Sequence, residues 1–403
     1  MKKTHRSLIS LQAGRWFKLI GGASYQHLPS IRNLALAYTL AGADCIDVAA
    51  DPAVVNAVKE SFRILSRLPQ NSELIDLVPG KIPAELPLLM VSFSDGDDPH
   101  FRKAQFDPDR CPRDCARPCE AICPAAAIAF TPATTGVIEE RCYGCGRCLP
   151  VCPIQHIETV TRATSPAAIA PSLLTQVDAI EIHTQVGRYD PFMALWAVLQ
   201  PYLPSLSVVS ISCPAQTGAV DYLWQLYQGI QPLQVPLIWQ TDGRPMSGDI
   251  GRGTTHATLR YARQMLQSGP PGYVQLAGGT NAHTAEKLAD LASEAVNSIN
   301  SPGLLSVNPS KPRLGGVAFG SFARRLLSPV LAEWTTEPVF ASAVPIDERL
   351  SCYDSESLSR SLLPLRQAVQ LAQSLVAPIQ GVPVQPEDGS LALGAIALMP
   401  QQS

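Results

Sequence analysis

Eight cysteines lie close together in the middle of the chain and form two runs, each ending in Cys-Pro. In the first run, three residues separate successive cysteines, which are Cys111, Cys115, Cys119 and Cys123. In the second run the gaps are two, two and three residues, and the cysteines are Cys142, Cys145, Cys148 and Cys152. Closely spaced thiolates of this kind bind iron–sulfur clusters. The sequence therefore predicts a protein that transfers or senses electrons.

The second run has the spacing of bacterial ferredoxins, in which the fourth cysteine of a run reaches across to the other cluster. The two runs form an internal repeat, in which the last three cysteines of each run are offset by 29 to 30 positions. Residues 107–160 therefore resemble a ferredoxin-like module with two [4Fe-4S] clusters. The resemblance implies one cluster on Cys111, Cys115, Cys119 and Cys152, and another on Cys142, Cys145, Cys148 and Cys123.

The first run departs from the ferredoxin pattern because two of its gaps hold three residues instead of two. A longer loop is less preorganised, so we expect its cluster to be the more labile, with [3Fe-4S] as the alternative to [4Fe-4S]. Structural zinc is the competing interpretation, but zinc ribbons use separated C-x2-C pairs. The remaining cysteines, Cys45, Cys213 and Cys352, are interpreted as buried thiols.

Short apolar runs alternate with amphipathic stretches on both sides of the cysteines, which is typical of βαβ units. Eight strands are expected, at 18–20, 45–48, 88–93, 178–182, 206–211, 236–239, 273–276 and 315–318. Helices are expected at 31–41, 53–67, 191–199, 220–228, 254–267, 282–295 and 322–331. Eight units predict a (β/α)8 barrel. An open doubly wound sheet is the alternative that the count leaves open.

The cysteine module interrupts this pattern between the third and fourth strands. We therefore divide the chain into a first part of the barrel (1–106), the module (107–160), a second part of the barrel (161–344) and a C-terminal helix and tail (345–403, helix at 357–376). Strand-to-helix loops lie on the barrel face that carries active sites. The module is thus predicted to lie above that face.

Two glycine-containing loops accompany the seventh and eighth strands, where (β/α)8 barrels commonly bind phosphate. The candidate residues are Gly278, Gly279, Thr280, Gly316, Gly320 and Ser321. Flavin mononucleotide (FMN) is a natural ligand beside iron–sulfur clusters, although glycines after strands also serve tight turns. Polar residues also collect at the predicted strand ends: Lys18, Asp47, Asp51, Glu181, His183, Asp242 and Arg244.

Composition narrows the function classes. The chain has 403 residues, a formal net charge of −3 and 46% hydrophobic residues, so nothing indicates a nucleic-acid partner. No apolar stretch reaches the roughly 18–20 residues of a transmembrane helix. Gln12, Gly14 and Arg15 interrupt the apolar stretch near the N-terminus, which argues against a signal peptide. With its cysteines concentrated in one region, the chain is expected to be cytoplasmic.

The segments 14–24 (GRWFKLIGGAS) and 42–49 (GADCIDVA), followed by the double cysteine run, resemble the cyanobacterial light-dependent period proteins. That resemblance implies an iron–sulfur redox sensor that reports to circadian clock input kinases and core clock proteins. The competing hypothesis is an FMN-dependent barrel oxidoreductase that receives electrons from the module. A plain electron carrier would leave most of the chain unexplained.

Overall fold

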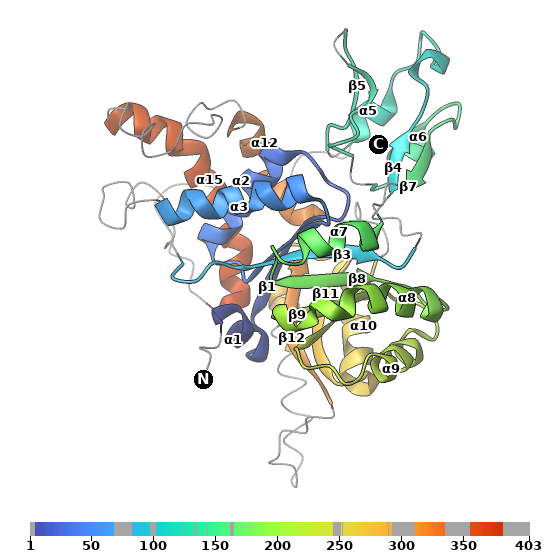
Figure 1. Cartoon of the computed structure of the whole chain (residues 1–403). Coiled ribbons are helices and arrows are strands. Elements are labelled where there is room, and N and C mark those ends of the chain that lie inside the picture. The colour runs from blue at the N-terminus through green and yellow to red at the C-terminus, as the bar shows by residue number, and fades with distance from the viewer. Residues whose placement is uncertain are drawn as a thin grey trace.

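Eight parallel strands close into a barrel in the order β1-β2-β3-β8-β9-β10-β11-β12 (Figure 1). This computed structural model describes residues 5–67, 83–96, 102–123, 125–132, 134–142, 144–161, 165–244, 251, 253–288, 290–291, 311–334 and 355–381. The predicted (β/α)8 barrel is confirmed, because the first and last strands pair with each other and leave no sheet edge open.

Each barrel strand lies within a few residues of its predicted position. The strands are β1 (Trp16–Gly22), β2 (Cys45–Ala49), β3 (Leu88–Ser94), β8 (Ala179–His183), β9 (Val208–Pro214), β10 (Leu237–Asp242), β11 (Gly272–Ala277) and β12 (Pro312–Phe319). The helices between them are α2 (Leu28–Ala41), α3 (Pro52–Arg67), α7 (Pro166–Leu173), α8 (Tyr189–Leu199), α9 (Ala219–Gly229), α10 (Thr255–Ser268) and α12 (Ser321–Trp334). Of the expected helix 282–295, residues 284–288 and 290–291 are helical, and 289 and 292–295 lie outside the described residues.

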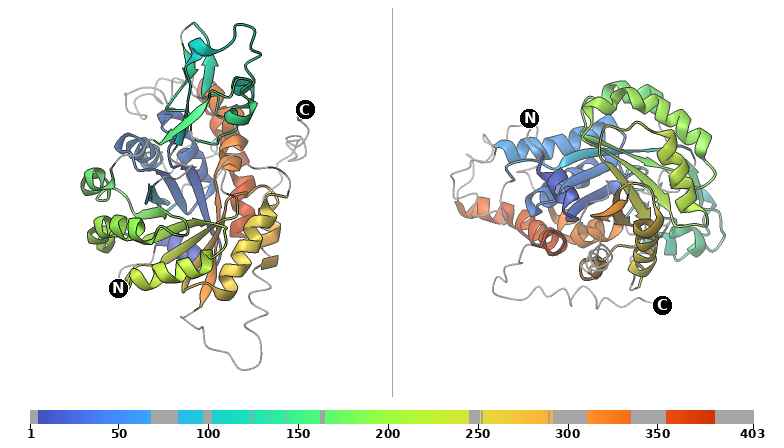
Figure 2. Two further views of the ribbon diagram at one scale, coloured as in Figure 1. Left: turned by 90° about the vertical axis from the view of Figure 1, so that its right-hand side faces the viewer. Right: turned by 90° about the horizontal axis from the view of Figure 1, so that it is seen from below.

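The strands form because both of their faces are buried, one inside the barrel and one beneath the helices (Figure 2, right). All five residues of β2 are buried. The amino end of the barrel is filled by apolar side chains, among them Trp16, Met90 and Ile238. Leu11 from helix α1 (Arg6–Gln12) belongs to the same cluster, so α1 closes this end.

The expected C-terminal helix is α15 (Ser355–Gln380), which packs against α2 and α12. Its last residue anchors it to the barrel, because Gln380 Nε2 donates to the carbonyl oxygen of Gly42 at 2.6 Å. Residues 382–403 of the predicted tail, and Cys352, lie outside the described residues.

The cysteine module stands at the carboxyl end of the strands, as a separate unit above the barrel (Figures 1 and 2). Its outer strands β4 (Arg102–Gln105) and β7 (Glu158–Thr161) pair antiparallel, as do β5 (Ile128–Phe130) and β6 (Thr135–Val137). Two short helices, α5 (Pro118–Ile122) and α6 (Cys148–Val151), end beside the Cys-Pro positions. A 3-10 turn, η2 (Pro108–Arg110), precedes the first run, and a second one, η3 (Gln200–Ser205), follows α8.

Over the part of the chain that the structure describes, none of the helices combines the length and the apolar character needed to cross a membrane.

Candidate metal centres

Four thiols from both cysteine runs face one cavity in the module. The thiols that line it are Cys123, Cys142, Cys145 and Cys148. The rest of its wall includes alanines and glycines such as Ala104, Ala127, Gly144 and Gly146. The structure thus brings together the four thiols that the ferredoxin resemblance assigns to one cluster.

The backbone around this cavity is shaped to approach the thiols closely. Gly144 and Gly146 adopt positive φ angles of 70° and 72°, which residues with a side chain rarely adopt. Two backbone amides donate to thiol sulfurs: Ala104 N–H to Cys142 Sγ at 3.3 Å and Ala127 N–H to Cys123 Sγ at 3.2 Å. Such hydrogen bonds stabilise thiolates and tune cluster potentials.

The donor set fits an iron–sulfur cluster. Burial raises the pKa of the Cys148 thiol to about 12, and its neighbours Cys145, Cys142 and Cys123 add to the increase. Four thiolates in this space would repel one another unless cationic iron lay between them. Among the described residues, no three His, Cys, Asp or Glu side chains converge on a point suited to a single metal ion. The thiols instead surround a space.

A second group contains the other four cysteines of the two runs. Burial raises the pKa of the Cys111 thiol, and the nearby Cys115 and Cys152 raise it further. Burial likewise raises the pKa of Cys119, with Cys111 and Cys115 among the contributing neighbours. These four are the thiols assigned to the other cluster. Cys111 and Cys115 are half-buried, whereas Cys119 and Cys152 are buried.

One residue of the first run, between its second and third cysteines, has an unusual backbone conformation. Arg117 adopts a positive φ of 53°, which costs on the order of 1 kcal/mol for a residue with a side chain. Its guanidinium lies over the ring of Phe130, 4.4 Å from the centroid, and this cation–π contact offsets part of that cost. On the Cys152 side, His156 Nδ1 lies 3.6 Å from Cys152 Sγ, and its Nε2 contacts the Asp107 carbonyl oxygen at 3.1 Å.

The two groups of thiols differ in their distance from the barrel. Cys145 and Ala125 pack against the hydrophobic core of the barrel. Cys111 and Cys115 take no part in that packing. We therefore call the group with Cys145 the proximal site and the group with Cys111 the distal site.

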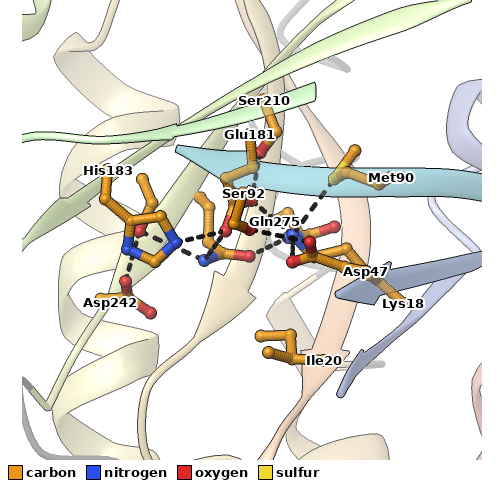
Figure 3. Close-up of polar contacts among 12 residues, drawn as sticks. Lys18, Ile20, Asp47, Met90, Ser92, Glu181, His183, Ser210, Asp242 and Gln275 are labelled. Carbon is orange, nitrogen blue, oxygen red and sulfur yellow. Dashed lines mark hydrogen bonds and ion pairs between the residues drawn. The ribbon is translucent and has the colours of Figure 1, made fainter. Parts of the chain in front are cut away.

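Below the module, the barrel interior holds a buried polar network (Figure 3). Lys18 Nζ lies 3.2 Å from Asp47 Oδ2 and forms a short ion pair with Glu181. Glu181 also accepts from Ser210 Oγ at 2.7 Å and from Gln240 Nε2 at 2.9 Å. Five of the strands supply these side chains, so the network ties the barrel wall together across its interior.

The network fixes the charge of its lysine. Burial alone would lower the pKa of Lys18, but the carboxylates of Asp47 and Glu181 outweigh burial and raise it. Burial raises the pKa of Asp47 to about 6, whereas Lys18 lowers the pKa of Glu181 despite burial. Lys18 is therefore an ammonium ion held between carboxylates, which is a poor nucleophile.

His183 and Asp242 lie at the mouth end of this network. His183 Nε2 is 3.2 Å from Glu181 Oε1, and Figure 3 shows its ring between Glu181 and Asp242. Of the seven polar residues predicted at strand ends, five thus come together. The other two do not: Asp51 Oδ1 accepts from the Ala53 N–H at 2.7 Å at the start of α3, and Arg244 is exposed.

The predicted phosphate residues are divided between two structural settings. Gly278, Gly279, Thr280, Gly320 and Ser321 lie in or beside the loops after β11 and β12. Gly316 lies within β12, opposite Trp16 of β1, so it belongs to the barrel wall. In the loops, a Cβ on Gly278 would come within 2.8 Å of the Arg244 carbonyl oxygen, and the Thr280 hydroxyl donates to the Ala318 carbonyl oxygen at 2.8 Å. Phosphate binding here stays a prediction.

The two thiols outside the runs that the structure describes, Cys45 and Cys213, are buried. Burial raises the pKa of Cys213 to about 12 and raises that of Cys45 well above its usual value. Neither is a thiolate at neutral pH, which agrees with their interpretation as buried thiols.

Sequence reasoning missed the residues that join module to barrel. Lys103 is buried at this junction, and its Nζ donates to Gln26 Oε1 at 2.7 Å. Lys103 precedes the cysteine runs, and no motif distinguishes it from a surface lysine.

Comparison with known proteins gives two family matches. Residues 111–163 match the LdpA Fe-S cluster-binding domain, and residues 173–378 match the light dependent period A C-terminal domain. The chain is 51% identical over 325 residues to "Light dependent period A" of Synechococcus elongatus, which covers 80% of this chain and 84% of that protein.

Among solved structures, tryptophan synthase subunit alpha from Legionella pneumophila aligns over 94% of this chain and 100% of its own, at 11% identity and a TM-score of 0.37. The tandem GH20 catalytic modules of the pneumococcal exo-beta-D-N-acetylglucosaminidase StrH align over 91% of this chain and 96% of their own, at 10% identity and a TM-score of 0.24. Likenesses this weak say nothing further about fold or function.

Proposed function

The chain belongs to the light dependent period A family, and on that premise we propose that it is an iron–sulfur redox sensor. It reports the light-dependent redox state of the cell to circadian clock input kinases and core clock proteins. The observation that carries this proposal is the pair of four-thiol sites held in a module above a closed barrel.

The proposed ligands are two sets of cysteines. Cys123, Cys142, Cys145 and Cys148 would bind the proximal cluster, and Cys111, Cys115, Cys119 and Cys152 the distal one. A bound cluster would supply reversible one-electron storage. Because Cys145 packs against the barrel core and the distal thiols do not, the distal site would exchange electrons with the surroundings, while the proximal site would face the barrel. We assign [4Fe-4S] to the proximal site and either [4Fe-4S] or [3Fe-4S] to the distal one.

The barrel favours a scaffold over a catalyst. Its interior lysine is neutralised by two carboxylates, and further polar side chains of the network hydrogen-bond to Glu181. Reacting groups in catalytic barrels need poised pKa values and access to a substrate. Lys18, at 0% exposure and with a raised pKa, offers neither.

An FMN-dependent oxidoreductase is the second candidate, and the loop after β11 is the observation that favours it. Gly278 and Gly279 adopt positive φ angles of 63° and 100° beside the mouth of the barrel, the usual phosphate position. Flavin released from the purified protein by heat and quantified by fluorescence separates the two candidates. Stoichiometric flavin would favour the enzyme.

The sensor proposal is tested by partner binding under controlled redox conditions. Protein purified anaerobically is poised oxidised or reduced, and its affinity for a purified clock input kinase is measured in each state. We expect the two affinities to differ for wild type and to become equal for Cys145→Ser, which lacks a proximal ligand. Cys213→Ser is the matched control, because it replaces a buried thiol away from the module. Equal affinities for oxidised and reduced wild type would refute the sensor.

A further inference from the structure

Lys103 is buried where the module meets the barrel. Only 1% of it is exposed, and it lies on β4, the strand that enters the module. Its Nζ donates to Gln26 Oε1 and to the carbonyl oxygen of Glu139, both at 2.7 Å. Gln26 belongs to the loop after β1, and Glu139 to the turn that precedes Cys142. One ammonium group therefore bridges the barrel and a turn that carries a thiol ligand.

The barrel side of this bridge is held firmly. Gln26 Nε2 donates to Asp51 Oδ2 at 2.8 Å, and the Gln26 backbone N–H donates to the carbonyl oxygen of Glu140 at 2.9 Å. Asp51 in turn caps the first turn of α3. Lys103 is thus positioned by groups from two strand-to-helix loops of the barrel.

The module side of the bridge leads directly to the proximal site. Ala104, the next residue, donates its N–H to Cys142 Sγ at 3.3 Å, and both residues line the cavity. The distal site lies toward the other end of this segment, where the Asp107 carbonyl oxygen contacts His156 beside Cys152. Asp107 lies four positions after Lys103, beyond the end of β4 at Gln105.

We propose that Lys103 sets the reduction potential of the proximal cluster and, through Glu139, positions Cys142. The proposal rests on the redox-sensing function proposed above and lies outside the matched cluster-binding residues 111–163. A buried cation stabilises the reduced, more negative form of a nearby cluster, so its presence raises the potential. Its amide and carbonyl contacts fix where that charge lies.

The test is a redox titration of the full-length protein purified anaerobically, with both clusters followed by electron paramagnetic resonance. The proximal signal is identified as the one that Cys145→Ser alters. We expect Lys103→Met to shift the proximal midpoint potential to a more negative value and to move the distal one much less. Lys103→Arg, which keeps the charge, should stay close to wild type. Lys59→Met is the matched control, because it removes an ammonium from α3, where Lys59 bonds to Gln176.

Two results would overturn the proposal: an unchanged proximal potential in Lys103→Met, or equal shifts at both clusters. If Lys103→Met fails to retain the proximal cluster, Lys103→Gln decides instead. This variant keeps a hydrogen-bond donor at the position but removes the charge, and we expect it to lower the proximal potential. An unchanged potential in Lys103→Gln would refute the proposal.

The outcome is independent of the sensor assay. The potentials are measured on the isolated protein, whereas redox sensing is judged from kinase affinity. A shifted proximal potential with no redox-dependent kinase binding would support the role of Lys103 and refute the redox-sensing function. An unshifted potential with redox-dependent kinase binding would refute the role of Lys103 and support the redox-sensing function.

Discussion

Replacing Lys18 by methionine is predicted to destabilise the barrel strongly, and to do so in a pH-dependent way. Lys18 is fully buried and neutralises Asp47 and Glu181, which are themselves buried. Removing one member of a buried ion pair costs about 3–5 kcal/mol, because the remaining charge is left unpaired. For a domain of this size, that cost corresponds to a decrease in Tm on the order of 10 °C.

The sign of the pH dependence follows from the two carboxylates. In the wild type, Lys18 lowers the pKa of Glu181, so this contribution is present above the unfolded pKa of about 4.3 and is lost as pH falls below it. In Lys18→Met, the ammonium no longer offsets burial, which raises the pKa of both carboxylates. The folded variant then gains stability relative to the wild type as pH falls and the carboxylates are protonated. The gap between variant and wild type should therefore be larger at pH 7.5 than near pH 5.

Tryptophan fluorescence during thermal unfolding measures this gap, because Trp16 and Trp239 are fully buried in the barrel wall. Lys59→Met is the control, and its Tm should stay close to wild type because a surface substitution changes stability by about 0.5 kcal/mol at most. A decrease of less than about 1 kcal/mol in the free energy of unfolding of Lys18→Met would refute the reasoning, because even an exposed surface ion pair contributes up to about 1 kcal/mol. So would a gap of the same size at both pH values.

Two further predictions concern the barrel seam and the distal site. Gly316→Ala should destabilise by about 3 kcal/mol or more, because φ is +149° and the new Cβ would lie 2.1 Å from the Trp16 carbonyl oxygen. Gly320→Ala, whose Cβ would meet nothing nearer than 3.6 Å, should stay within about 1 kcal/mol of wild type in urea unfolding. Similar losses in both variants would contradict the assignment of Gly316 to the barrel wall. On controlled exposure to air, the distal cluster should decay before the proximal one in electron paramagnetic resonance, because Cys111, Cys115 and Cys119 lie on the longer and less preorganised run. Equal decay rates would argue against unequal sites.

The barrel could be predicted from sequence because its strands are buried on both faces. A run such as Cys45–Ala49, with every residue buried, is apolar enough to be recognised without knowing its neighbours. The charged strand-end residues of the network were also found by position alone. Ser210 and Gln240 were not, and neither was Gln275, whose Nε2 donates to Gln240 Oε1 at 2.6 Å. A neutral polar residue in a strand can face solvent as easily as the interior. Only closure of the barrel directs them inward.

The way in which the module is attached to the barrel could not be predicted from the sequence, for a different reason. Strand β4 pairs with β7 across the whole module, with Lys103 opposite Val160. Nothing local to residues 102–105 indicates a partner so distant in sequence, so the segment was assigned to the barrel. The same long-range pairing buries Lys103, and burial is what distinguishes it from other lysines.

The two buried lysines differ in the groups that contact them. For this reason we assign Lys18 a role in the stability of the barrel and Lys103 a role in the redox chemistry of the module. Lys18 lies between two carboxylates, so the field of its charge is cancelled within a few ångströms. The oxygens 2.7 Å from Lys103 Nζ belong to Gln26 of the barrel and to the turn before Cys142, so its contacts join the barrel to the proximal site. A cation held in this way can act on a cluster next to it. The barrel therefore contributes to the proximal site through Gln26 at its rim, which contacts Lys103 of the module.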